Sequence, residues 1–216
     1  MNHGSLQAYG SWWAVLGNSA LFILLALTFV LPRSGRDWQS FGAFSVFIVA
    51  VFTEMYGYPF TVVLLPKWLG FELAGLKPVS HDYEHPWYSW LGLEGEPHRN
   101  PVHLLSDAVI AAGFVLLALA SSVLSFARRR GELAKSGLYR RVRHPQYAAL
   151  VTIMLGFLLQ WPTLPTMVMF PLLAVMYVRR AEYEEREAAN RFGDCWRAYA
   201  LNTPRWFPKL RIQERH

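Results

Sequence analysis

The stretch from Gly137 to Tyr147 reads GLYRRVRHPQY and places Arg140, Arg141, Arg143 and His144 within five positions, directly before an apolar run. Such a cluster can contact nucleic-acid phosphates, orient a membrane helix or bind an anionic small molecule. Pro145 favours a helix that begins there, and a helix start presents free N–H groups and a positive dipole end to a carboxylate. Histidine carries no dependable charge at neutral pH, so orientation alone does not account for His144.

A second polar cluster, RRAEYEEREAANRFGDCWRAY, occupies residues 179–199. Arg180 and Glu184 are four residues apart and therefore share one face of a helix. We expect Glu182, Arg186 and Glu187 to form a solvated face with ion pairs inside the helix. Cations from the first cluster and carboxylates from the second could together hold a zwitterion.

The elements that must position these clusters are membrane helices. Apolar residues make up 53% of the 216-residue chain and are concentrated in blocks, and a helix needs roughly 20 apolar residues to cross a bilayer. The last two blocks are short, are separated by the turn-prone QWPTLP, and can span only if their helices continue beyond the apolar part. We therefore expect an all-α integral membrane protein with about five transmembrane helices, including a C-terminal helical hairpin, and a cytoplasmic C-terminal helical extension. The apolar blocks are Ser11–Leu31, Phe41–Leu65, Asp107–Phe126, Ala148–Leu159 and Leu164–Tyr177.

The distribution of positive charge predicts the orientation of these helices. If the N-terminus lies outside, the inner flanks hold Arg33 and Arg36, seven Lys or Arg between Arg128 and Arg143, and nine from Arg179 to Arg215, which is 18 of the 21. This bias predicts a cytoplasmic C-terminus. It also explains the net charge of +6 without nucleic acid, because no aromatic-interleaved basic groove accompanies the charge. For Arg128, Arg129 and Arg130 we expect orientation to be the whole role.

The N-terminal residues MNHGSLQAYGS lack the features of a cleaved signal, so we expect the first span to be retained. The single Cys195 falls on the inner side and is expected to stay reduced. Glu54 lies inside the second span, where an ionisable group is costly, and it should face other helices or water.

The loop from Pro66 to His103 contains donors that suit zinc or a similar divalent ion. Their spacing is irregular and no cysteine joins them, so we assign no metal ligands and expect a solvated or aromatic-packed interfacial loop, with metal binding as the alternative. The donors are His81, His85, His98, His103, Asp82, Glu84, Glu94 and Glu96.

Taken together, GLYRRVRHPQY, the hairpin, the pair Glu184–Glu185 followed by FG, and TPRWFP resemble the C-terminal half of the isoprenylcysteine carboxyl methyltransferases. The broader group includes membrane phospholipid N-methyltransferases. The likeness covers roughly Leu133 to Pro208 and suggests a division into N-terminal spans with the outer loop (1–126) and a methyltransferase-like core (127–216). It implies S-adenosylmethionine bound without a Rossmann domain, and no G-x-G-x-G signature is present.

The resemblance also implies roles for particular residues. Arg180 matches the position that meets the methyl acceptor. Ala188 departs from the family, which has a bulky apolar residue there. The matches to cofactor-contacting positions are Leu133, Tyr139, His144, Pro145, Gln146, Tyr147 and Glu184.

From these features we expect a multi-pass methyltransferase of a prokaryotic inner membrane that takes a lipophilic acceptor from the lipid. A carboxylate acceptor would be oriented by Arg180, whereas an amine acceptor would need a base such as Glu185; the sequence favours the carboxylate. Two alternatives remain open. Sterol-type membrane reductases resemble the same C-terminal half and bind NADPH, and the whole chain resembles small membrane proteins found beside bacterial nickel, cobalt, zinc and cadmium efflux systems.

Overall fold

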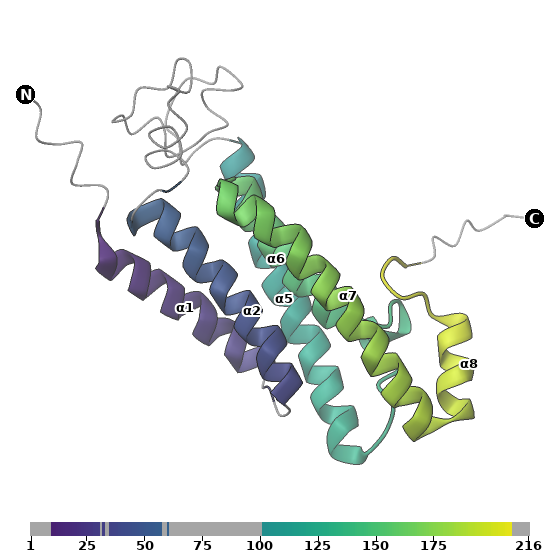
Figure 1. Cartoon of the computed structure of the whole chain (residues 1–216). Coiled ribbons are helices and arrows are strands. Elements are labelled where there is room, and N and C mark those ends of the chain that lie inside the picture. The colour runs from purple at the N-terminus through teal and green to yellow at the C-terminus, as the bar shows by residue number, and fades with distance from the viewer. Residues whose placement is uncertain (1–9, 31, 33–34, 58–59, 61–100, 209–216) are drawn as a thin grey trace, which may run out of the picture.

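The computed structural model describes residues 10–30, 32, 35–57, 60 and 101–208, and these contain helices but no strand (Figure 1). Two helices precede the undescribed region 61–100, and four helices with one 3₁₀ turn follow it. In chain order the elements are α1 (Trp12–Val30), α2 (Gly35–Phe52), the π-helical turn η1 (Thr53–Gly57), α5 (Pro101–Arg130), the 3₁₀ turn η5 (Gly137–Arg140), α6 (Pro145–Gln160), α7 (Leu164–Phe192) and α8 (Asp194–Asn202).

The predicted fold class is confirmed. Four helices are long and apolar enough to cross a membrane, namely α1, α2 with its π-helical turn, α5 and α7, and α6 is a shorter apolar helix of 16 residues. Helix α7 has 29 residues and at about 1.5 Å per residue is longer than the ~30 Å hydrocarbon core. The continuation beyond Tyr177 that the sequence required is therefore present, and the last turns of α7 extend outside the membrane.

Among the described helices, α5 and α6 pack most extensively on each other, because small residues let their backbones approach. A side chain at Gly113 would meet the backbone nitrogen of Ile153 at 3.0 Å, and one at Gly156 would meet that of Ile110 at the same distance. Such small residues are typical of helix contacts in membranes. The predicted turn between α6 and α7 is present, but α6 packs far more extensively on α5 than on α7.

Aromatic packing joins the N-terminal helices to this pair. The ring of Phe22 in α1 lies 5.5 Å from that of Phe52, 5.9 Å from that of Phe114 and 5.1 Å from that of Phe157. The buried core thus draws on α1, α2, α5, α6 and α7. The division of the chain at residue 126 stays a prediction.

Two polar groups of α2 and η1 lie inside the bundle. Glu54 is buried in η1, as the cost of exposing a carboxyl to lipid predicts. Ser40 in α2 accepts a hydrogen bond through its carbonyl oxygen from the hydroxyl of Tyr177 in α7, at 3.2 Å. This bond holds α2 against α7 next to the polar end of both helices.

Candidate functional site

Local sequence sets the two ends of the segment that carries the basic cluster. Helix α5 ends at Arg130, with three arginines in its last turn opposing the negative end of its dipole. Pro145 occupies the first turn of α6 with His144 as its N-cap residue, as predicted. Between them the chain turns through η5, which packs on α5 and buries Tyr139 there, and then reaches His144, which contacts α7.

A cavity of about 450 Å³ opens at this end of the bundle. It is bounded by α2, α5, α6, α7 and α8 and by the connection 131–144. Seven of the eight predicted site residues line it, and Pro145, which is buried at the start of α6, does not. The seven are Leu133, Tyr139, His144, Gln146, Tyr147, Arg180 and Glu184.

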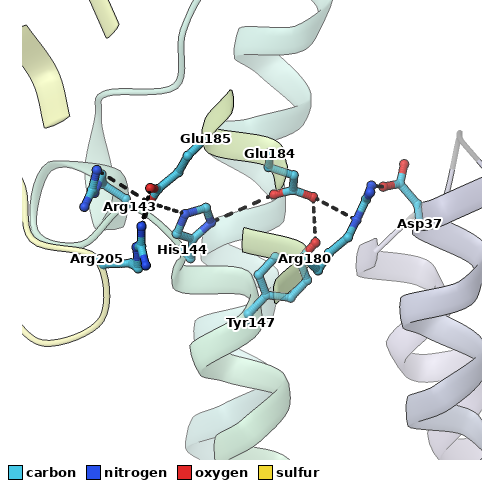
Figure 2. A network of polar contacts seen from close by, with 8 residues as sticks. All are labelled: Asp37, Arg143, His144, Tyr147, Arg180, Glu184, Glu185 and Arg205. Atoms are coloured by element: carbon cyan, nitrogen blue, oxygen red, sulfur yellow. Dashed lines mark hydrogen bonds and ion pairs between the residues drawn. The ribbon is translucent and has the colours of Figure 1, made fainter. Parts of the chain in front are cut away.

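Glu184 lies at the centre of the polar network in this wall (Figure 2). Its Oε1 accepts a hydrogen bond of 2.6 Å from the hydroxyl of Tyr147 and lies 3.5 Å from Nε of Arg180. The second contact confirms the predicted pairing of residues four apart. Nη2 of Arg180 in turn donates to Oδ1 of Asp37 at 3.2 Å, so α2 completes a site that the sequence assigned to the C-terminal half alone.

His144 joins the basic residues before α6, Arg140 to His144, which we call the basic corner, to the acidic side chains of α7. It is only 7% exposed, its Nε2 lies 2.9 Å from Oε1 of Glu185, and its Nδ1 lies 3.9 Å from Oε2 of Glu184. Because a carboxylate can only accept a hydrogen bond, Nε2 carries the proton in the contact with Glu185. The two clusters that the sequence singled out therefore meet at one end of the membrane bundle.

Glu185 faces away from the cavity, so it is not placed to remove a proton from an acceptor there, as the sequence suggested for an amine. It accepts hydrogen bonds from Arg205 Nε at 3.0 Å and Nη2 at 2.7 Å, and Arg143 Nη1 lies 3.5 Å from it. Charge-assisted bonds of this kind are the strong ones. The acids that do line the cavity are Asp37, Glu132, Glu184 and Glu187.

One expectation about a charged residue needs correction. Glu182 pairs with Arg205 at 3.3 Å, through a turn of the chain that brings the C-terminal segment back, and not within its own helix. Glu187 and Arg128 are exposed, and both also line the cavity. The pairing of Glu182 could not be predicted from helix spacing because its partner lies 23 residues away along the chain.

Arg143 carries an unpaired donor in the cavity wall. Its Nε is buried and has no hydrogen-bond partner among the residues that the structure describes, while its guanidinium lies 5.9 Å from the Trp196 ring. Most buried donors in proteins have a partner, so this nitrogen is an exception.

Helix α8 contributes a pair of aromatic residues that the sequence did not assign to the site, Trp196 and Tyr199. The hydroxyl of Tyr199 donates to the carbonyl oxygen of Tyr139 at 2.6 Å. Burial raises the pKa of the Tyr139 phenol and raises the pKa of Tyr199 to about 12, so both stay neutral. The sequence offered one indication of this pair. Trp196 and Tyr199 are three residues apart, and this spacing places both rings on one face of a helix.

The structure does not test the outer metal site. His81, His85 and His98 lie outside the described residues, and His103 is hydrogen-bonded to Gln160. Within the described part of the chain, no three His, Cys, Asp or Glu side chains form a group that could hold a metal ion.

Residues 105–194 match the family model of phospholipid methyltransferases, which covers less than half of the chain but includes all of α6, all of α7 and the basic corner. No curated protein and no solved structure shows a significant match. The matched segment ends before Trp196 and does not reach back to Asp37, so part of the cavity wall lies outside it.

Proposed function

We propose that the chain is a membrane-embedded, S-adenosylmethionine-dependent methyltransferase that acts on a lipophilic acceptor. One observation carries the proposal: His144 and Glu184 meet at a common cavity, inside a segment similar to phospholipid methyltransferases. The family likeness points to methyl transfer, and the cavity supplies a place for a donor and an acceptor to meet.

The cavity lining suits the methyl donor chemically. S-adenosylmethionine presents a carboxylate, an ammonium, a sulfonium and an adenine ring, and when bound it supplies an electrophilic methyl group. The guanidinium of Arg143 can meet a carboxylate, Glu132 and Glu187 can meet cations, and Trp196 offers an aromatic face. A volume of about 450 Å³ falls in the usual range for a small-molecule site.

The residues assigned to the donor are held in place by their neighbours. Tyr147 and Arg180 fix the carboxylate of Glu184, and Gln146 donates from Nε2 to the hydroxyl of Ser121 at 2.9 Å. Methyl transfer requires donor and acceptor atoms nearly in line, so prior positioning of the wall lowers the barrier. Leu133, Tyr139 and His144 complete this wall, and Pro145 acts by setting the helix start that presents His144.

Arg180 is the residue proposed to orient the acceptor, because it bridges α7 and α2 at the membrane end of the cavity. A carboxylate acceptor, which the sequence favours, would share the guanidinium with Asp37 and Glu184. An amine acceptor is the second candidate. Asp37 and Glu184, which both lie within 3.5 Å of Arg180, could remove the proton from the amine. Both acceptors would come from the lipid of a prokaryotic inner membrane, with the cavity open to the cytoplasm.

Donor binding tests the site. Calorimetry with S-adenosylhomocysteine and the detergent-solubilised protein should give a saturable isotherm that His144→Ala and Glu184→Gln each weaken. Losing one hydrogen bond to a charged group, about 1.5–3 kcal/mol, corresponds to roughly 10-fold to 100-fold in Kd. Asp194→Asn is the matched control, because Asp194 is exposed and lies outside the cavity. Unchanged affinity in both site variants would remove the proposed site, and binding of NADPH in place of the methionine derivative would favour a reductase.

Product chemistry decides between the two acceptors. Membranes that contain the protein should incorporate label from methyl-labelled S-adenosylmethionine into the lipid extract, and membranes with Glu184→Gln should incorporate less. A methyl ester releases its label in mild base, whereas an N-methyl group keeps it. Absence of labelled lipid from protein that binds the donor would exclude a lipid acceptor.

A further inference from the structure

The segment after α8, Thr203 to Phe207, returns to the end of the membrane bundle, and we call it the return segment. At about 1.5 Å per residue, α7 carries the chain roughly 18 Å from Arg180 to Phe192. Helix α8 then runs back beside α7 toward the bundle (Figure 1). The chain therefore leaves the level of the site and comes back to it.

Four contacts fix the return segment to the basic corner. The backbone N–H of Arg143 donates to the carbonyl oxygen of Pro204 at 2.9 Å, and that of His144 donates to the carbonyl oxygen of Arg205 at 3.4 Å. The ring of Trp206 lies 5.6 Å from that of His144, and the side chain of Arg205 bonds to Glu185 in α7. These bonds hold the segment at the level of His144.

Two features of the chain lead us to place the edge of the hydrocarbon at this level. His144 immediately precedes the apolar helix α6, and Arg180, at the end of the apolar part of α7, belongs to the same polar network. Next to the anchored Trp206, the side chain of Phe207 is 84% exposed. Aromatic residues are enriched at the boundary between lipid and water, so an exposed ring at this level suits lipid contact.

We propose that the return segment is a lipid-contact surface in which Phe207 enters the boundary between headgroups and acyl chains. Trp206, next to Phe207, contacts His144, and Arg205 binds Glu185, so both residues connect the return segment to the site. The bilayer surface thereby holds the return segment against the side of the basic corner that faces away from the cavity. This proposal rests on the membrane fold and not on the proposed reaction.

The test places a fluorescent probe at position 207 of the full chain. In a Cys195→Ser background, which removes the single native cysteine, Phe207→Cys is labelled with a polarity-sensitive dye and reconstituted into phosphatidylcholine–phosphatidylglycerol nanodiscs. The control is Arg197→Cys in the first turns of α8, where the native side chain is 72% exposed. The dye at 207 should emit at shorter wavelength than the dye at 197, be quenched by spin-labelled lipid and resist iodide.

Two results would overturn the proposal. The dye at 207 could be quenched by iodide as fully as the dye at 197, which would place Phe207 in water. It could also resist both quenchers, which would mean that protein, such as a second copy of the chain, covers it. Equal thermal unfolding midpoints for the labelled variants and the Cys195→Ser parent show that the comparison concerns folded protein. Failure of the proposed reaction would appear in donor binding and leave the quenching result unchanged.

Discussion

Replacement of Glu185 by glutamine should destabilise the folded protein strongly although it exchanges only one carboxylate oxygen for an NH₂ group. The side chain of Glu185 is 12% exposed, and its two oxygens accept bonds of 2.7 to 3.0 Å from His144 and Arg205. Removing one partner of a buried ion pair costs about 3–5 kcal/mol. Because Arg205 is itself one-third exposed, solvent screens part of this effect, and we expect the free energy of unfolding to fall by about 3 kcal/mol.

The matched control is Glu182→Gln, the same substitution three residues earlier on the same helix. Glu182 also pairs with Arg205, but at 3.3 Å and with a side chain that is 41% exposed. Such a pair contributes under about 1 kcal/mol. The two substitutions thus test whether the loss in free energy of unfolding depends on burial of the carboxylate or only on its pairing with Arg205.

The assay is reversible unfolding in mixed micelles by titration with sodium dodecyl sulfate, followed by far-ultraviolet circular dichroism. A double-mutant cycle of Glu185→Gln with Arg205→Gln should show a coupling energy well above the ~0.5 kcal/mol expected of independent sites. Equal losses for Glu185→Gln and Glu182→Gln, or no coupling between Glu185 and Arg205, would refute the assignment of Glu185 as the buried anchor of the return segment.

Three further predictions concern packing, the donor site and pH. Gly113→Ala should cost about 1–3 kcal/mol by overpacking the α5–α6 contact, while Gly42→Ala, with nothing within 4 Å of the new carbon, should not destabilise; the same unfolding assay checks both. Tyr147→Phe removes the 2.6 Å bond to Glu184 and should weaken S-adenosylhomocysteine binding roughly 10-fold or more by calorimetry. Tyr199 has a pKa of about 12 in the folded protein against 10.0 ordinarily, so the unfolded chain loses this proton first and stability should fall between these pH values; an unfolding series should show a shallower fall for Tyr199→Phe.

Several features of the site follow from short stretches of sequence. Pro145 limits where α6 can begin, and this places His144 at a helix start. A spacing of four residues puts Arg180 and Glu184 in contact on α7. The apolar blocks required helices of membrane length, and the extension of α7 past Tyr177 was needed for that helix to span. Each of these inferences depends on neighbours along the chain, where backbone geometry relates residue spacing to position in space.

Contacts between segments that are distant along the chain could not be predicted from the sequence in this way. Asp37 precedes an apolar span, where no local pattern assigns it to the site, and only the packing of α2 on α7 brings it to Arg180. The sequence suggested that the neighbouring acids Glu184 and Glu185 serve the same site. Successive residues on a helix point about 100° apart, and in the structure Glu184 faces the cavity while Glu185 faces Arg205. Spacing along the chain determined which residues could share a helix face, whereas the fold decided which faces meet, because that depends on how side chains from all the helices fill the space between them.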